Sequence, residues 1–308
     1  MDESNDTSPM ALVVVTRDRA SIFDRYVMPC LRHAGDLGVD VVVVDQSSGP
    51  AIRHLVEGRP WLRYLRSEPG LSRGRNAGVA ATSAQITVFT DDDVEFGPDW
   101  LPRIRSLFKD PMVGVVCGRG IDSWGRSLSY KRAGTYRWPT SPFSLGHGFN
   151  MAFRRAALDD AGPFDERLGA GAVIPSAEDT DMIYRVMRAG WAALCDDHIT
   201  VRHHDWRSEV AQRAVYRNYG VGFAAQTVKH AREGDTAAIR IAAAHLVRHG
   251  AWSVKTLVRR DRRSLRFQRA WLRGVMAGLL SSARSVDRMD HCAAGPVDGV
   301  AQASPRAH

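Results

Sequence analysis

Three consecutive aspartates, Asp91, Asp92 and Asp93, stand directly behind the apolar run 86–89 in the segment TDDDV. Like charges at the end of a buried strand repel one another unless a cation or water offsets them. Hard divalent cations prefer oxygen ligands, and one or two carboxylates with substrate phosphates commonly complete their coordination. If the strand geometry continues, Asp91 and Asp93 face one side and Asp92 the other. The segment therefore indicates a metal site; an arginine cluster, a solvated acidic turn or a helix cap are the alternatives.

A second pair of acids, Glu178 and Asp179, begins the segment EDTDMIYRVMRAGW. Apolar residues follow at helical spacing and predict a short helix that Gly190 ends. These residues are Met182, Ile183, Val186 and Met187. Both acids then lie in the first turn, where the helix dipole stabilises carboxylates. A structural role suffices for them there, but a carboxylate that reaches an acceptor hydroxyl could also serve as a general base.

Two adjacent histidines, His203 and His204, follow an expected short strand at 199–202. One imidazole could complete a metal shell, and a mixture of oxygen and nitrogen ligands suits Mn²⁺ better than Ca²⁺. Neighbouring residues on a strand point to opposite faces, so at most one of the two can serve. A surface histidine pair without a metal is the alternative.

The segment GLSRGRNAG, residues 70–78, contains three glycines and two arginines. It lacks the Gly-Lys-Ser/Thr ending of a phosphate-binding P-loop. Arg73 and Arg75 near a helix start could still neutralise a diphosphate.

These residues depend on an alternation of strands and helices in the first half of the chain. The expected strands are 11–16, 41–45, 62–66, 86–90, 113–117 and 199–202, and the expected helices are 20–34, 51–57 and 72–83. Continuously apolar, β-branched runs are typical of parallel strands buried on both faces, and the alternation predicts a doubly wound α/β sheet. Ligands collect at the carboxyl ends of such strands. We therefore expect Thr16, Asp45 and Asp91 to converge on one edge.

The second half of the chain is organised differently. Residues 120–146 are irregular and rich in Gly, Ser, Trp and Pro, as in a substrate-binding loop region. Helical periodicity follows over 208–230, 236–258 and 264–284. The expected organisation is a flexible N-terminus at 1–9, an α/β domain at 10–205, a helical extension at 206–285 and a disordered tail at 286–308.

Basic residues are concentrated in the helical extension. The net charge is +8, and between Lys229 and Arg273 there are twelve Lys and Arg but three acids. Such a run indicates an anionic partner, or else a solvated helix face. Its mixture of apolar and basic residues is compatible with binding to an anionic membrane surface, with Trp252 and Trp271 at the headgroup boundary. A helical cover for the sheet domain or a homodimer contact is the alternative.

Composition and cysteine usage favour a cytoplasmic protein. No apolar stretch reaches the ~18 residues that span a bilayer, and the N-terminus MDESNDTSPM is too acidic and polar for a signal peptide. The four cysteines show no CxxC pairing, which indicates free thiols in a reducing compartment. A position on the inner face of the membrane remains compatible with these features.

Taken in chain order, these segments resemble family 2 glycosyltransferases, the inverting, metal-dependent enzymes of the GT-A fold. The matching segments are ALVVVTRDRA, VVVVDQSSG, GLSRGRNAGVAAT, FTDDDVEFGPDWL, GFNMAFRRAALDDAGPFDERLGAG with EDTDMIYRVMRAGW, and VRHH. The resemblance extends from residue 11 to about residue 205. It implies a GT-A, Rossmann-like, mostly parallel sheet flanked by helices, to which the C-terminal helices are an extension.

The resemblance also implies roles for individual residues. The nucleotide-sugar site would contain Thr16, Asp45, Arg75, Asp91 and Asp92. Asp45 would contact the base or ribose, and Asp91 and Asp92 the ribose or the metal. Asp93 would be the principal ligand of Mn²⁺ or Mg²⁺.

In the acceptor half, the resemblance makes Asp179 the catalytic base with Glu178 as its neighbour, and His203 the second protein ligand to the metal. Gln46 departs from the family pattern, in which a second acid is common, so recognition of the base could differ. The donor would be a nucleoside-diphosphate sugar. The acceptor would be an unidentified hydroxyl compound, with a lipid-linked or membrane-proximal one compatible with the basic helices, and no nucleic acid would take part.

Two other functions fit parts of the sequence. A sugar nucleotidyltransferase would need a glycine-rich loop after the first strand, where this chain has TRDRAS. A non-catalytic nucleotide-sugar-binding protein would leave the acid and histidine groups without a joint role.

Overall fold

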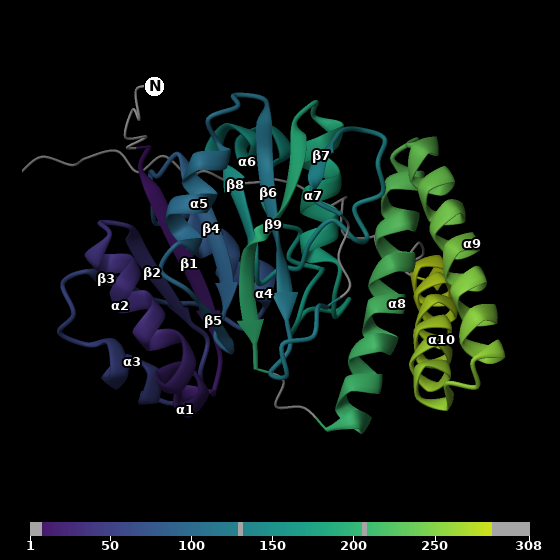
Figure 1. Cartoon of the computed structure of the whole chain (residues 1–308), viewed down its shortest axis with the longest axis horizontal. Helices are drawn as coiled ribbons and strands as arrows, with labels where there is room; N and C mark the ends of the chain where they lie inside the picture. Colours follow the sequence, from purple (N-terminus) through teal and green to yellow (C-terminus); the bar gives the residue numbers. More distant parts are fainter. Residues whose placement is uncertain (1–7, 129–131, 205–207, 285–308) are drawn as a thin grey trace, which may run out of the picture.

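The computed structural model describes residues 8–128, 132–204 and 208–284, and a mixed β-sheet lies at the centre of these residues (Figure 1). The strands are β1 (Met10–Thr16), β2 (Asp40–Asp45), β3 (Leu62–Arg66), β4 (Ile86–Asp91), β5 (Val94–Phe96), β6 (Val113–Ile121), β7 (Gly134–Tyr136), β8 (Met151–Arg154) and β9 (Ala192–His203). Their order is β3-β2-β1-β4-β8-β6-β9-β5, with β7 paired to β9. Only the short β5, β7 and β8 run against their neighbours, so the described part of the sheet is mostly parallel, as predicted.

Helices cover both faces of this sheet. The segments before the C-terminal extension are α1 (Ala20–Ile22), the π-helical turn η1 (Phe23–Val27), α2 (Met28–Asp36), α3 (Ala51–Val56), α4 (Leu71–Ala80), α5 (Trp100–Leu107), α6 (Arg155–Ala161) and α7 (Glu178–Arg188). One hydrophobic cluster joins the sheet to η1, α2, α3 and α5, and a second joins it to α6 and α7, with α4 packed against it. The domain is therefore a three-layer α/β structure, the architecture that the resemblance to the GT-A fold implies.

Strand β1 shows why these apolar runs form the centre of the sheet. All seven of its residues are buried. Leu12 and Val14 contribute to one hydrophobic cluster, while Val13 and Val15 contribute to the other. Side chains alternate between the two faces of a strand, and those of β1 are apolar from Met10 to Val15, so both faces must be covered. The helices provide that cover.

Glycine lets α4 approach the sheet closely. A Cβ atom at Gly74 would lie 2.6 Å from Cγ1 of Val15, and one at Gly78 would overlap Val13. Only the absence of a side chain allows the helix backbone to rest on β1 at this distance. Arg75, which directly follows Gly74, is thereby placed near the carboxyl end of the sheet.

Three long helices form a bundle beside the sheet (Figure 1): α8 (Glu209–Arg232), α9 (Thr236–Val258) and α10 (Arg262–Arg284). The backbones of α8 and α10 touch at Gly220 and Gly274, where any side chain would collide with a carbonyl group of the opposite helix. Phe223 and Trp271 pack between them. The expectation that Trp271 lies at a membrane headgroup boundary is wrong, because its side chain is buried in this cluster.

The predicted elements agree with the structure where they are long. The strand expected at 199–202 is the end of the twelve-residue β9. Strands β5, β7 and β8 were not predicted, because three or four residues are too few to show a period. Cys30, Cys117 and Cys195 are buried free thiols.

Three expectations from the sequence concern residues that the structure does not describe. The flexible N-terminus concerns mainly residues 1–7, the domain boundary lies within 205–207, and the expected disordered tail lies within 285–308, all outside the described residues. Among the helices that are described, none combines the length and the apolar character needed to cross a bilayer.

Candidate active site

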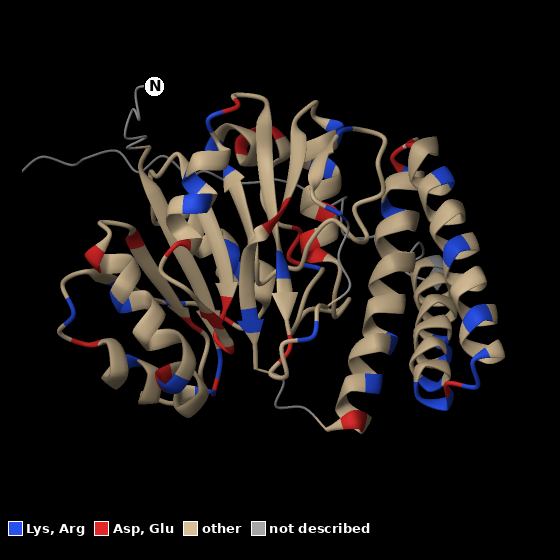
Figure 2. Ribbon diagram, in the orientation of Figure 1, with Lys and Arg blue, Asp and Glu red and all other residues tan. Residues whose placement is uncertain are grey.

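The carboxyl ends of three parallel strands meet at one edge of the sheet and carry the predicted polar residues. Thr16 pairs in register with Asp45 of β2, and Val15 pairs with Asp91 of β4. Figure 2 shows acidic residues gathered at this end of the strands. Parallel pairing thus brings residues from three distant segments to one place, as the strand pattern predicts.

Asp91, Asp93 and His203 form the candidate metal group of this edge. One ligand atom from each lies within 4.8 Å of the others. The antiparallel pairing of β5 with β9 sets Val94 opposite His203, which places the imidazole beside Asp93, with Nε2 3.4 Å from Asp93 Oδ1. Two carboxylates and an imidazole are a donor set that suits Mn²⁺ and can also hold Mg²⁺. We call these three residues the metal group.

Asp92 points to the opposite side and is completely buried. Its Oδ2 accepts a hydrogen bond of 2.7 Å from Thr16 Oγ1, and its Oδ1 lies 2.7 Å from a guanidinium nitrogen of Arg19. Burial raises the pKa of Asp92 to about 7, and the charge of Arg19 only partly offsets this. Asp92 therefore ties the end of β4 to the turn after β1 and is separate from the metal group.

Arg19 lies in the candidate site and was not singled out from the sequence. Besides Asp92, it reaches Asp93 Oδ2 at 3.2 Å. This edge therefore contains both the metal group and an arginine whose charge offsets that of the aspartates. The available signal was the segment TRDRA, which places a cation directly behind the first strand.

The second histidine, His204, faces away from the metal group. Its Nε2 lies 3.1 Å from Glu95 Oε2, and its ring stacks on Tyr26 at 3.7 Å between centroids. His203 instead contacts Phe149. The two imidazoles diverge because His203 ends β9 and His204 directly follows it, and neighbouring residues of extended backbone point to opposite sides.

Asp45 lies in a buried polar pocket at the end of β2. Its carboxylate accepts hydrogen bonds from the Ser47 backbone at 2.8 Å, from the Tyr64 hydroxyl at 2.8 Å and from Arg66 at 3.0 Å. Burial acts to raise the pKa of Asp45, but these hydrogen bonds outweigh it and hold the pKa below its usual value. Tyr64 and Arg66 belong to β3, which was predicted as a strand, but neither was predicted as a site residue.

Gln46, the departure from the family pattern, holds the neighbouring loop. Its amide nitrogen donates to the carbonyl groups of Glu68 and Gly70 at 2.7 and 2.9 Å, and its oxygen accepts from the Gly70 amide at 3.2 Å. The side chain thus fixes the entry to α4. A carboxylate at this position could not donate these bonds.

Arg75 is buried between the metal group and α7, with 2% of its side chain exposed. Its guanidinium lies 3.1 Å from Glu178 Oε1 and 3.7 Å from Asp91 Oδ1, and it donates to the Gly148 carbonyl at 3.1 Å. Burial, with Asp179 next in effect, raises the pKa of Glu178 to about 7. Burial also raises the pKa of Asp91, which Arg75 opposes. Arg75 is therefore the charge that makes this group of acids tolerable.

Arg73, the other arginine of the glycine-rich segment, points elsewhere. It pairs with Glu166 at 3.0 Å and is half exposed.

Asp179 occupies the first turn of α7 beside these groups. Its Oδ1 accepts the amide of Thr180 at 2.7 Å. A Cβ at Gly148 would lie 2.7 Å from an Arg75 nitrogen and 3.3 Å from Asp179 Oδ2, so the loop before β8 passes directly over both. Ala177, immediately before α7, has a left-handed backbone with φ of +77°. A left-handed backbone is uncommon for a residue other than glycine and is concentrated at functional sites.

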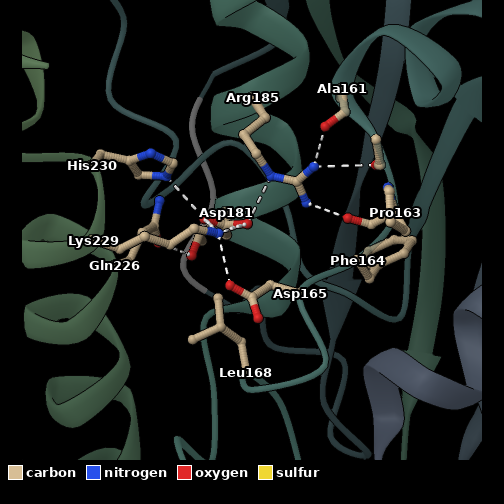
Figure 3. Close-up of polar contacts among 12 residues, drawn as sticks. Ala161, Pro163, Phe164, Asp165, Leu168, Asp181, Arg185, Gln226, Lys229 and His230 are labelled. Carbon is tan, nitrogen blue, oxygen red and sulfur yellow. Dashed lines mark hydrogen bonds and ion pairs between the residues drawn. The ribbon is translucent and has the colours of Figure 1, made fainter. Parts of the chain in front are cut away.

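A buried ionic network fixes α7 to the C-terminal bundle (Figure 3). Asp181, completely buried, accepts hydrogen bonds from Arg185 at 2.8 Å, from Lys229 at 2.9 Å and from His230 at 2.8 Å. Lys229 also bridges to Asp165 at 2.9 Å. Burial acts to raise the pKa of Asp181, but these partners hold it at about 2. Since Lys229 and His230 belong to α8, the bundle helps to position the helix that carries Asp179.

Comparison with known proteins agrees with this geometry. The family model described as Glycosyl transferase family 2 matches residues 12–162, which include Asp45 and the aspartate run. This segment of the chain belongs to glycosyl transferase family 2. The match ends before the second acid pair and His203, so their roles rest on the structure and on the resemblance between segments.

Curated relatives of the chain include the pre-mycofactocin glycosyltransferases of two strains of Mycobacterium tuberculosis. Each is 27% identical over 227 residues, which cover 67% of this chain and 46% of the relative. The chain thus spans about half the length of the curated relatives it matches.

Solved structures share the fold at low sequence identity. The mannosyltransferase PcManGT from Pyrobaculum calidifontis, in complex with GDP-Man and Mn²⁺, is 18% identical and superposes with a TM-score of 0.62, covering 90% of this chain and 89% of its own. Residues 1–349 of S. aureus TarS, in complex with UDP-GlcNAc, are 16% identical with a TM-score of 0.53, covering 92% of each chain. These likenesses support the GT-A fold of family 2.

Proposed function

We propose that this family 2 chain transfers a sugar from a nucleoside-diphosphate sugar to an acceptor hydroxyl, with inversion at the anomeric carbon. The observation that carries the proposal is the buried Arg75, which contacts Asp91 of the metal group on one side and Glu178 on the other. A divalent-ion site and a candidate general base, Asp179, are thereby held next to each other. A diphosphate leaving group needs the first, and an attacking hydroxyl needs the second.

The metal group fits Mn²⁺ or Mg²⁺ by its ligand atoms. Asp93 and His203 would hold the ion, with Asp91 shared between the ion and the donor ribose. When bound, the ion supplies Lewis-acid stabilisation of the negative charge that develops on the diphosphate. Asp92 keeps the strand end in place through Thr16 and Arg19, and so helps to position Asp91 and Asp93 on either side of it.

The donor nucleotide would lie along the strand edge that ends in Thr16 and Asp45. The solved relatives PcManGT and TarS contain GDP-Man and UDP-GlcNAc, which are both nucleoside-diphosphate sugars. Asp45 is kept ionised by its hydrogen bonds and so can accept a hydrogen bond from the nucleoside. Arg75 would complement the diphosphate from beneath while neutralising the acids around it.

Asp179 acts as the general base in this proposal. It takes the proton of the acceptor hydroxyl as the oxygen attacks the anomeric carbon from the face opposite the diphosphate. The bond to the diphosphate breaks in the same displacement, which inverts the configuration. Glu178, paired with Arg75, would hold Asp179 in the first turn of α7.

For the acceptor, a lipid-linked or membrane-proximal hydroxyl compound fits the basic C-terminal helices. The same helices would keep the chain at an anionic membrane surface, and a homodimer contact through them is the alternative.

Exchange of Asp179 for Asn tests the proposal. General-base assistance is worth about 10²–10⁴-fold, so Asp179→Asn should lower the rate of sugar transfer by about that factor while donor binding stays within about twofold of wild type. Asp197→Asn, a change at an exposed acid on β9, should leave both unchanged. Transfer of a radiolabelled sugar measures the rate, and calorimetry measures donor binding. Near-normal transfer by Asp179→Asn would contradict the assignment.

A further inference from the structure

Helix α9 exposes a continuous stripe of large aliphatic side chains. The residues of this α9 stripe are Ile239, Leu246, Val247, Val254, Leu257 and Val258, and their exposed fractions run from 40% to 76%. At ~100° per residue they fall within an arc of about 120°, and from first to last they extend over roughly 29 Å. The residues that α9 buries, including Ala238, Ile241 and Thr256, lie outside this arc.

Such a stripe is not needed for the packing of the bundle. In Figure 1, α9 forms the outer edge of the three-helix bundle. Contiguous exposed apolar patches of this size on a folded chain mark a surface that is covered by a partner.

Basic residues run along one side of the α9 stripe. They are Arg240, Arg248, Lys255 and Arg259, spaced over the same length of helix (Figure 2). The α9 sequence contains no Asp or Glu, and α10 opens with two further arginines. The surface therefore combines an apolar band with a cationic border, which is the composition of helices that lie in the plane of a membrane interface.

Charge decides between the candidate occupants. In an antiparallel symmetric dimer through α9, the cationic border of one copy would face that of the other without α9 acids between them, and like charges would oppose association. A nucleic acid would satisfy the basic residues but would leave six aliphatic side chains in water. An anionic lipid surface matches both features, because acyl chains accept the stripe and headgroups pair with the border.

We propose that the α9 stripe docks in the plane of an anionic membrane surface, with Arg240, Arg248, Lys255 and Arg259 against the lipid phosphates. Trp252 lies on another side of the helix, so insertion is assigned to the aliphatic residues. The inference deepens the proposed function by naming the surface that brings the site to a membrane-borne acceptor. Binding to vesicles is measured without catalysis, so it can fail or succeed independently of sugar transfer.

Vesicle flotation tests the proposal with the full chain. Wild type should float with vesicles of phosphatidylcholine mixed with phosphatidylglycerol, should not float with phosphatidylcholine alone, and should be released by high salt. The triple variant Val247→Ser, Val254→Ser, Val258→Ser should lower the partition coefficient by about tenfold or more. Arg248→Gln with Lys255→Gln should weaken it by several-fold and flatten the salt dependence.

Matched controls separate docking from folding and from catalysis. Val210→Ser changes another exposed valine, on α8, and should float like wild type. Asp179→Asn should also float like wild type, even though the proposed function predicts that it is inactive. Circular dichroism of the triple variant should match that of wild type, because its three positions are exposed.

Four outcomes would overturn the proposal. Wild type that does not float with anionic vesicles contradicts it directly, as does a well-folded triple variant that floats like wild type. A dimer of wild type in light scattering that the triple variant loses would assign the stripe to a second copy. Salt-sensitive retention by single-stranded or duplex DNA in place of vesicle binding would assign the border to nucleic acid.

Discussion

Asp181→Asn is the perturbation whose consequences the structure defines most fully. The change keeps the size of the side chain and removes its charge. Lys229 and Arg185 then face a neutral amide in a buried site, and His230 loses its carboxylate partner (Figure 3). Because the three donors come from α7 and α8, the variant weakens the join between the α/β domain and the bundle.

The magnitude follows from two independent estimates. A carboxyl whose pKa falls from 3.8 to about 2 on folding stabilises the folded state by about 2 kcal/mol once it is ionised in both states. Removing one member of a buried ionic network costs about 3–5 kcal/mol, since the remaining charges lose their partner. We expect Asp181→Asn to lower the free energy of unfolding by about 3 kcal/mol at pH 7.

The contribution of Asp181 to the free energy of unfolding depends on pH. The folded-state pKa of Asp181 is depressed, so its contribution is present above the unfolded-state value and is lost as the pH falls from about 4 towards 2. Urea unfolding followed by fluorescence should therefore show a constant gap between wild type and variant from pH 7 to pH 5. The gap should narrow below pH 4 for as long as both remain folded.

The matched control is Asp197→Asn, at an exposed acid of β9, which should change the free energy of unfolding by less than about 0.5 kcal/mol. Two results would refute the reasoning. One is a variant that unfolds at the same urea concentration as wild type. The other is a gap that grows as the pH falls from 5 to 3.

The remaining predictions concern the residues around Arg75. Burial raises the pKa of Glu178 to about 7, so the metal-free protein should lose stability as the pH rises from about 4.5 to 7. Glu178→Gln should reduce this dependence of the melting temperature on pH. An unchanged dependence would contradict the raised pKa. Gly148→Ala places a Cβ 2.7 Å from an Arg75 nitrogen and should displace Arg75 and Asp179, which should lower the rate of sugar transfer by about tenfold or more. The control Gly250→Ala has open space around its Cβ and should leave the rate unchanged. Equal rates for the two variants would show that the loop at Gly148 does not position these side chains.

The sequence was informative where one element carries the signal. Strands β1, β2 and β4 were predicted because they are buried on both faces, and their polar ends, at Thr16, Asp45 and Asp91, converge as parallel pairing requires. The strand geometry assumed for the aspartate run does not continue, because β4 ends at Asp91 and a turn at Asp92 and Asp93 leads into β5. The turn nevertheless keeps Asp91 and Asp93 together in the metal group and leaves Asp92 bonded to Thr16.

Other features depend on partners that are distant in the chain. Arg19 meets Asp92 across 73 positions, and Lys229 meets Asp181 across 48. Tyr64 could not be predicted as a site residue, because its hydroxyl reaches Asp45 only when β3 is paired with β2. No local period or spacing encodes such contacts, so they emerge only when the layers are assembled.

The most direct test is a thermal-shift panel of nucleoside-diphosphate sugars, with and without Mn²⁺, on wild type and on Asp93→Ala. Wild type should be stabilised by at least one nucleotide sugar in the presence of Mn²⁺ and much less without it, because the metal group binds the diphosphate through the ion. Asp93→Ala should lose this metal-dependent stabilisation. If no nucleotide sugar stabilises wild type with Mn²⁺ or Mg²⁺, or if Asp93→Ala responds like wild type, the proposed nucleotide-sugar site is wrong.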